Sequence, residues 1–269
     1  MPAAELLIER DDDGVGRIVL DRPAAKNALT PAMRDGITDA IREFRADPAV
    51  RAVLVTGAGD AFCAGMDLSA STVAHAGKPG FSPRTTAEAL RAGVQTFIRE
   101  LWELDKPTVA AVNGAAVGPG AHLALACDFV FVHPKTRFMW SFAKWGLVAD
   151  AGGAYLLPRL VGLPRAKAMV MLGESATGAE AVALGLAYHC VDDPAELLQT
   201  ALETTRVLAA GPTRSLGLSK RLLNATFETD LPHSLELEAS FQALATTSPD
   251  VVEGMAAFRE KRDADFSGT

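Results

Sequence analysis

An aspartate in an apolar stretch is the residue best suited to acid–base chemistry. Asp150 lies in the segment GLVADAGGAYLLP, shortly after several aromatic side chains. An apolar pocket raises the pKa of a carboxyl group toward working pH, as a general acid or base requires. Trp140, Phe142 and Trp145 could line such a pocket, although they suit ordinary core positions equally well. An aspartate before Ala-Gly-Gly is also typical of a helix N-cap, so the residues alone leave both roles open.

Two glycine-containing loops, each after an apolar run, could supply hydrogen-bond donors. FCAGMDL covers residues 62–68, and NGAAVGPGAHLALACD covers residues 113–128. Backbone N–H groups near a helix N-terminus donate to anionic oxygens. Two such donors aimed at a thioester carbonyl would form an oxyanion hole for an enolate. Glycine turns after strands are common, so the spacing alone does not decide. Neither loop has the dinucleotide-binding or Walker pattern.

The elements that would position these residues alternate between strands and helices. Apolar runs predict strands at residues 17–20, 51–57, 108–112, 128–132 and 137–140. Thr30-Pro31 predicts a helix start, because a hydroxyl N-cap is followed by a proline suited to the first helical position. A longer helix is expected over 87–104, and residues 71–86 are expected to form a flexible loop over the core. This alternation favours an α/β fold.

The last quarter of the chain has a helical pattern throughout. Helices are predicted near 195–209, 213–226, 232–247 and 249–262. Their apolar faces need partners, so we expect them to pack on the core and on neighbouring subunits. We therefore divide the chain into an α/β core over residues 1–200 and a helical region over 201–269 that serves oligomerisation.

Composition and charge exclude several classes of protein. The 26 basic and 33 acidic residues give a formal charge of −7, which argues against nonspecific binding to nucleic acid or to an anionic membrane. The three cysteines lack metal-like spacing, so no metal site is expected. No apolar run is long enough for a signal peptide or a membrane span. We expect a soluble, cytoplasmic protein.

Four separated motifs resemble the signatures of the crotonase (enoyl-CoA hydratase/isomerase) superfamily, in the same order. They are FCAGMDL, NGAAVGPGAHLALACD, GLVADAGGAYLLPRLVG at 146–162 and EGMAAFREKR at 253–262. The resemblance covers residues 6 to 268 and implies a spiral of ββα units with a helical C-terminal trimerisation region, assembled as a homotrimer or dimer of trimers. It also implies an acyl-CoA thioester substrate, with coenzyme A as part of the substrate and no separate cofactor.

The resemblance also assigns residues to the thioester. The backbone N–H of Met66 matches the first oxyanion donor of the family, and Pro119 matches the second. The coenzyme A contacts that it implies are Ala25, Ala64, Asp67 and Leu68, with Phe258 and Lys261 closing over the phosphates from an adjacent subunit. For Lys261, a charged run is equally typical of a solvated helix face.

Two catalytic glutamates of the hydratases are absent. Their positions hold His122 and Phe142, so the family's mechanism of water addition is not available. Asp150 instead matches the catalytic aspartate of dienoyl-CoA isomerases, chlorobenzoyl-CoA dehalogenases and 1,2-epoxyphenylacetyl-CoA isomerases. The chain is most similar to the last group. His122 is either a buried structural residue or an active-site group that carries a proton, orients the substrate or tunes Asp150.

Pro119 departs from the family pattern because proline has no N–H to donate. The loss of one oxyanion donor typically costs about 3–4 kcal/mol in the transition state. Either Gly118 or Gly120 donates instead, or His122 helps, or the protein is slow or non-catalytic. The sequence favours an acyl-CoA isomerase acting through Asp150. The alternatives are an enoyl-CoA hydratase and a weakly active or non-catalytic acyl-CoA binder.

Overall fold

Between residues 52 and 139, strands that follow one another in the sequence alternate between two sheets. The computed structural model describes residues 5–69, 78 and 81–269. The larger sheet has the order β1 (Leu6–Arg10), β2 (Val15–Leu20), β3 (Ala52–Gly57), β5 (Thr108–Val112), β7 (Phe129–Val132) and β10 (His189–Cys190). The smaller sheet has the order β4 (Ala61–Cys63), β6 (Ala115–Val117), β8 (Arg137–Met139) and β9 (Ala176–Thr177).

Each of β3, β5 and β7 leads directly into a strand of the smaller sheet, and a helix follows each pair. Neighbours β2, β3, β5 and β7 run parallel, as do β4, β6 and β8. The helices are α1 (Pro31–Ala46) after the β1–β2 hairpin, α2 (Pro83–Ala92) with α3 (Val94–Trp102) after β4, α4 (Pro119–Leu125) after β6 and α5 (Gly153–Val161) after β8. This arrangement confirms the predicted spiral of ββα units.

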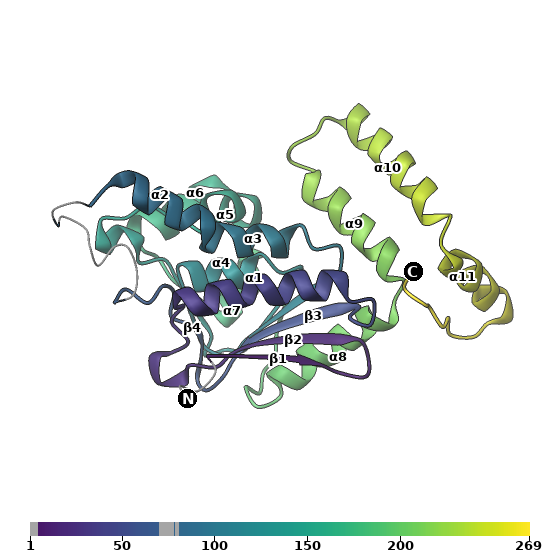
Figure 1. Ribbon diagram of the computed structural model, residues 1–269, viewed down its shortest axis with the longest axis horizontal. Helices are drawn as coiled ribbons and strands as arrows, with labels where there is room; N and C mark the ends of the chain where they lie inside the picture. The colour runs from purple at the N-terminus through teal and green to yellow at the C-terminus, as the bar shows by residue number, and fades with distance from the viewer. Residues whose placement is uncertain (1–4, 70–77, 79–80) are drawn as a thin grey trace.

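The larger sheet is buried on both faces because its side chains alternate between two cores. In β3, Val53 and Val55 pack with α1 and α3, whereas Ala52 and Leu54 pack with α8 (Leu197–Ala210). This is the two-residue periodicity of an extended strand. Figure 1 shows α1 and α8 on either side of the strands. A strand buried on both faces reads as a continuous apolar run, which is why β3 could be predicted.

The single helix predicted over residues 87–104 is wrong. The chain forms α2 and α3 instead, and they meet at Gly93, whose φ of −103° and ψ of −107° are not helical. A Cβ at Gly93 would lie 2.9 Å from the backbone carbonyl of Ala89 and 2.5 Å from Nη1 of Arg34, so a side chain there would force its neighbours to shift. In the predicted loop over 71–86, residues 71–77, 79 and 80 lie outside the described residues, and α2 already begins at Pro83.

The C-terminal helices extend away from the sheets (Figure 1). They are α9 (Thr213–Ala225), α10 (Leu231–Ala245) and α11 (Pro249–Glu260), close to the predicted ranges. The boundary placed between residues 200 and 201 falls inside α8, which packs on the larger sheet. Two further helices, α6 (Leu163–Lys167) and α7 (Gly178–Leu184), complete the core.

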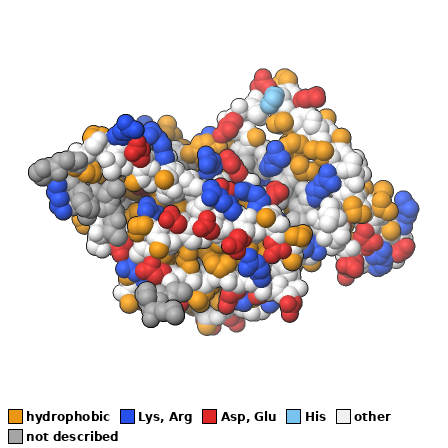
Figure 2. Space-filling view, viewed as in Figure 1, with side chains coloured by type: hydrophobic (Ala, Val, Ile, Leu, Met, Phe, Trp, Pro, Cys, Tyr) orange, Lys and Arg blue, Asp and Glu red, His pale blue; other side chains and the backbone are white. Residues whose placement is uncertain are grey.

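Large apolar side chains remain exposed on this C-terminal extension. Figure 2 shows apolar side chains among the charged ones over α9 and α10. The exposed apolar residues of α9, α10 and α11 are Leu223, Leu231, Leu235, Leu244, Val252, Met255 and Phe258. None of the helices in the described ranges is both long enough and apolar enough to cross a bilayer.

Candidate active site

A cavity of about 280 Å³ opens where three parallel strands of the smaller sheet end. Ala64 and Met66 follow β4, Gly118 and Pro119 follow β6, and Phe142 follows β8 in the short helix η3 (Phe142–Trp145). The carboxyl ends of parallel strands lie at one edge of a sheet, and loops that leave them converge there. The fold therefore brings together the two glycine loops and the apolar segment before Asp150.

Two further walls close the cavity. One is the segment from Trp145 to Asp150, which contributes Leu147 and Val148. The other consists of α1 and α2, which contribute Arg34, Thr86 and apolar side chains such as Leu90. These α1 and α2 residues were not predicted. Arg34 directly follows the buried Met33 of an amphipathic helix, which gave no signal of a site.

Asp150 is the one carboxyl group on the described cavity wall. Burial raises the pKa of its side chain to about 6. Oδ1 is buried and has no hydrogen-bond partner among the described residues. A carboxyl group that is neither paired nor fully solvated can exchange a proton near neutral pH.

The turn after Asp150 holds the side chain away from a capping role. The N-cap of α5 is Gly152, and no side chain caps this helix. Ala151 and Gly152 both have positive φ, of 47° and 76°. A positive φ is unfavourable for alanine, so the surrounding contacts must hold this turn. The N-cap interpretation of Asp150 is therefore wrong.

His122 lies behind the cavity wall and is fully buried. Its Nε2 accepts a hydrogen bond of 3.1 Å from Nε1 of Trp140, and its ring stacks against Phe142 with an interplanar angle of 8°. Burial lowers the pKa of the imidazole to about 4, although the backbone carbonyl of Asp150 opposes this shift. His122 is therefore neutral near pH 7, with its proton on Nδ1, because Nε2 is the acceptor.

Gly153 fits against the face of this imidazole. A Cβ at position 153 would lie 2.0 Å from Cε1 of His122, so only glycine allows the close contact. Through Gly153, α5 and the Asp150 turn rest directly on His122. Of the predicted acyl-pocket residues, Phe142 and Trp145 line the cavity, whereas Trp140 is buried with His122 behind the wall.

The loop that presents Met66 is clamped from both sides by Leu29. Leu29 N–H donates to Gly65 O at 2.8 Å, and Asp67 N–H donates to Leu29 O at 3.0 Å. Met66 N–H, between them, donates to no acceptor in the described part of the chain. A fixed N–H without an internal partner at a cavity wall is the arrangement that an oxyanion donor needs.

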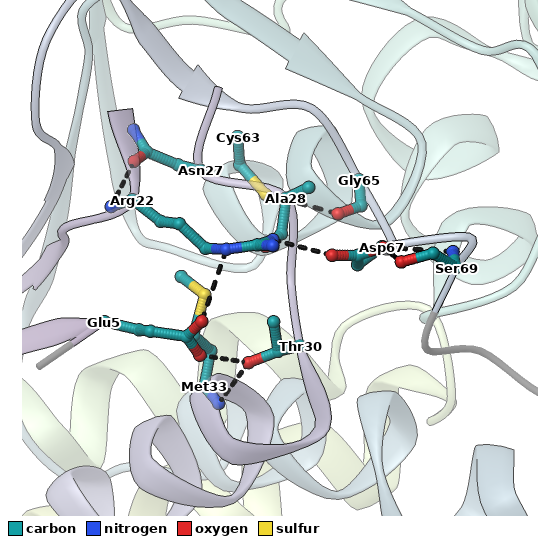
Figure 3. A network of polar contacts seen from close by, with 10 residues as sticks. All are labelled: Glu5, Arg22, Asn27, Ala28, Thr30, Met33, Cys63, Gly65, Asp67 and Ser69. Atoms are coloured by element: carbon teal, nitrogen blue, oxygen red, sulfur yellow. Dashed lines mark hydrogen bonds and ion pairs between the residues drawn. The ribbon is translucent and has the colours of Figure 1, made fainter. Parts of the chain in front are cut away.

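A polar network anchors this loop to the N-terminal strands (Figure 3). Nη1 of Arg22 donates to Oδ2 of Asp67 at 2.7 Å and to the Ala28 carbonyl at 3.1 Å. Ser69 donates to the other oxygen of Asp67 and, with Arg22, holds the pKa of this carboxyl below its usual value. Asp67 is thus a partner in a structural network rather than a free carboxylate.

The second glycine loop offers few donors. Gly118 N–H already donates to Met139 O at 2.9 Å, and Pro119 begins α4 without an N–H. Gly120 N–H has no acceptor among the described residues, but Gly120 is not on the cavity wall. A Cβ there would lie 2.5 Å from Cys63 O. Gly118 therefore cannot donate to a thioester without breaking its hydrogen bond to Met139 O.

The predicted coenzyme A residues fall into two groups. Ala64 and Leu68 line the cavity, and Ala25 ends a short helical turn, η1 (Pro23–Ala25), beside the Met66 loop. Phe258 and Lys261 are exposed at the end of α11. Figure 1 shows α11 at the opposite end of the molecule from α2, whose residues Thr86, Ala89 and Leu90 line the cavity. Within one chain, these two residues do not reach the site. In the described ranges, no three His, Cys, Asp or Glu side chains are grouped to hold a metal.

Comparisons with known proteins show similarity in both sequence and fold. A sequence profile of the enoyl-CoA hydratase/isomerase family matches residues 10–269. The chain is 36% identical to 1,2-epoxyphenylacetyl-CoA isomerase of Escherichia coli K12, over 98% of this chain and 99% of that protein. It is 34% identical to crotonyl-CoA hydratase of Syntrophomonas wolfei, over 98% of each. The crystal structure of an enoyl-CoA hydratase from Polaromonas sp. JS666 superposes with a TM-score of 0.90 at 30% identity, covering 97% of this chain and 99% of that one.

Proposed function

The chain belongs to the enoyl-CoA hydratase/isomerase family, and we propose that within this family it is an acyl-CoA isomerase whose proton carrier is Asp150. The observation that carries the proposal is the position of Asp150, the one carboxyl group on the described cavity wall, with its pKa raised to about 6 by burial. A group with this pKa is mostly ionised at pH 7 and can both accept and return a proton.

The reaction follows from one carboxylate and one peptide donor. The Asp150 carboxylate removes a proton from a carbon next to the thioester carbonyl or conjugated with it. The electron pair of the broken C–H bond moves into the carbonyl, and the resulting enolate oxygen accepts a hydrogen bond from Met66 N–H. Asp150 then delivers a proton, which can first exchange with solvent, to another carbon of the conjugated system. No oxidant, metal or added nucleophile is needed, and coenzyme A enters only as part of the substrate.

Water addition is less well supported by these residues. A hydratase needs a second group to activate water, and the positions that correspond to the family's glutamates hold His122 and Phe142. His122 is fully buried behind the wall and neutral, and Phe142 cannot exchange a proton. Asp150 alone can move one proton between carbons of a bound thioester, which is isomerisation.

We assign His122 a positioning role rather than a proton-carrying one. It links Trp140, through Nε2, to the Asp150 turn, which rests on the imidazole through Gly153. The strained Ala151–Gly152 turn needs such support to keep the Asp150 carboxyl at the cavity. We further propose that Met66 supplies the main oxyanion donor, because Pro119 has none and Gly118 N–H is occupied.

Product analysis separates the two activities. The purified protein is incubated with a 2-enoyl-CoA, a dienoyl-CoA and 1,2-epoxyphenylacetyl-CoA, and products are identified by mass spectrometry and NMR. We expect products of unchanged mass in which a double bond or ring has shifted. A product heavier by one water, formed from the enoyl-CoA at a comparable rate, would replace the isomerase proposal with a hydratase. Binding without any product would favour a non-catalytic acyl-CoA binder.

A further inference from the structure

Three buried polar atoms without partners belong to residues that line the same cavity. Among the described residues, six buried side-chain nitrogen or oxygen atoms have no hydrogen-bond partner. Three of them are Nε of Arg34, Oγ1 of Thr86 and Oδ1 of Asp150, and all three residues line this cavity. Buried polar groups are nearly always paired, so a cluster of unpaired ones points to a partner supplied by a ligand. Asp150 has a role in the proposed reaction, whereas Arg34 and Thr86 have none.

The Arg34 guanidinium is an uncompensated charge at an otherwise largely apolar wall. In the described part of the chain it forms no ion pair and no side-chain hydrogen bond. The missing side chain at Gly93, where α2 ends, leaves room for Nη1. The carbonyl end of α2 tolerates a positive charge, but it gives Nε no acceptor. A carboxylate is the best partner for a partly buried guanidinium, because it neutralises the charge and its two oxygens accept hydrogen bonds from the planar N–H donors.

Thr86 adds a hydroxyl donor to the same wall. It lies on α2, together with the cavity residues Ala89 and Leu90. Met66 and Asp150 belong to the other walls of the cavity. We infer that a thioester bound between them extends its acyl chain toward α1 and α2. Resting on the proposed acyl-CoA function, we propose that Arg34 and Thr86 form a subsite for a carboxylate at the far end of the acyl group. The favoured substrates are then thioesters of dicarboxylic acids.

Binding of three saturated thioesters of equal length tests this subsite without requiring turnover. Calorimetry compares adipoyl-CoA, 6-hydroxyhexanoyl-CoA and hexanoyl-CoA, which end in a carboxylate, a hydroxyl and a methyl group. We expect the wild type to bind adipoyl-CoA at least tenfold more tightly than hexanoyl-CoA, with the hydroxyl compound between them. Arg34→Met should abolish this preference and leave hexanoyl-CoA affinity within about twofold. Thr86→Val should weaken adipoyl-CoA binding severalfold.

Arg91→Met is the matched control, because Arg91 is an exposed arginine near the end of α2 and outside the cavity wall. It removes the same charge and should keep the full preference. Equal wild-type affinity for the three thioesters would overturn the subsite, as would an Arg34→Met variant that keeps the preference. If Arg34→Met weakens all three equally, the arginine has only a structural role. A carboxylate preference in a protein that catalyses no isomerisation would retain the subsite and reject the proposed reaction.

Discussion

Trp140 Nε1 donates a hydrogen bond of 3.1 Å to His122 Nε2, and this bond decides which nitrogen of the imidazole carries the proton. An acceptor Nε2 leaves the proton on Nδ1, on a ring whose pKa is lowered to about 4 by burial. The histidine that the resemblance aligns with a hydratase glutamate is therefore a neutral group that links Trp140 to the Asp150 turn. This relationship separates the role of His122 from that of Asp150 and makes both testable.

Substitution of His122 should change the rate without moving the pH profile. His122→Leu removes the acceptor for Trp140 N–H, which should destabilise the protein by about 1–3 kcal/mol and lower kcat at least tenfold. His122→Gln can still accept this hydrogen bond and should recover part of both losses. Thermal unfolding and kcat against pH measure the two effects. A variant whose kcat no longer falls at low pH would show that His122 itself carries the proton.

The rate should fall as the pH is lowered through about 6. The Asp150 carboxyl must be ionised to accept a proton, and burial raises its pKa to about 6, so the base form is lost below that pH. His122 titrates near 4 and is neutral across this range. The measurement is kcat/KM from pH 4.5 to 8.5, with a substrate that is stable over this pH range. An acid limb centred at the ordinary aspartate pKa, near 4, would contradict the burial of the carboxyl.

Replacement of Pro119 should speed the reaction. Pro119→Ala keeps the Cβ and restores a backbone N–H at the position of the family's second oxyanion donor. Since one such donor is typically worth about a hundredfold or more, we expect kcat to rise about tenfold or more with little change in KM. Pro134→Ala is the control, because Pro134 lies at an exposed turn, whereas a substitution in the core such as Leu123→Ala would leave a cavity. An unchanged kcat would mean that another donor already completes the hole.

The protein should assemble as a homotrimer or a dimer of trimers. The apolar side chains exposed on α9, α10 and α11 need a covering surface, and Phe258 and Lys261 cannot reach the cavity of their own chain. Light scattering at micromolar concentration measures the mass. Phe258→Ala and Lys261→Ala should weaken thioester binding severalfold without changing that mass. A monomeric protein would remove both residues from the site.

Local motifs singled out Met66, which follows β4, and Asp150, which follows the short helix η3. Met66 and Asp150 stand in glycine-containing segments whose chemistry can be read from a few adjacent residues, and the fold brings both to one cavity. The strands buried on both faces were equally visible as apolar runs. The division of the 87–104 helix at Gly93 was not, because the apolar spacing of Leu90, Val94, Phe97 and Leu101 continues across it.

The same limit explains the residues that the sequence did not reveal. Arg34 and Thr86 reach the cavity from two different helices, α1 and α2, and neither stands in a recognisable motif. Trp140 looked like a pocket residue because it precedes Phe142 and Trp145, yet its indole points to His122 behind the wall. Which side of a wall a side chain occupies depends on packing between distant segments, and the local sequence does not encode it.

Exchange of substrate protons with solvent deuterium tests the central claim most directly. The wild type and Asp150→Asn are incubated with an acyl-CoA thioester in deuterium oxide, and NMR follows the loss of the α-proton signal. Asparagine has the shape of aspartate but cannot accept the proton, so the variant should bind the thioester with unchanged affinity and exchange at least a hundredfold more slowly. An Asp150→Asn protein that exchanges α-protons at the wild-type rate would contradict the account.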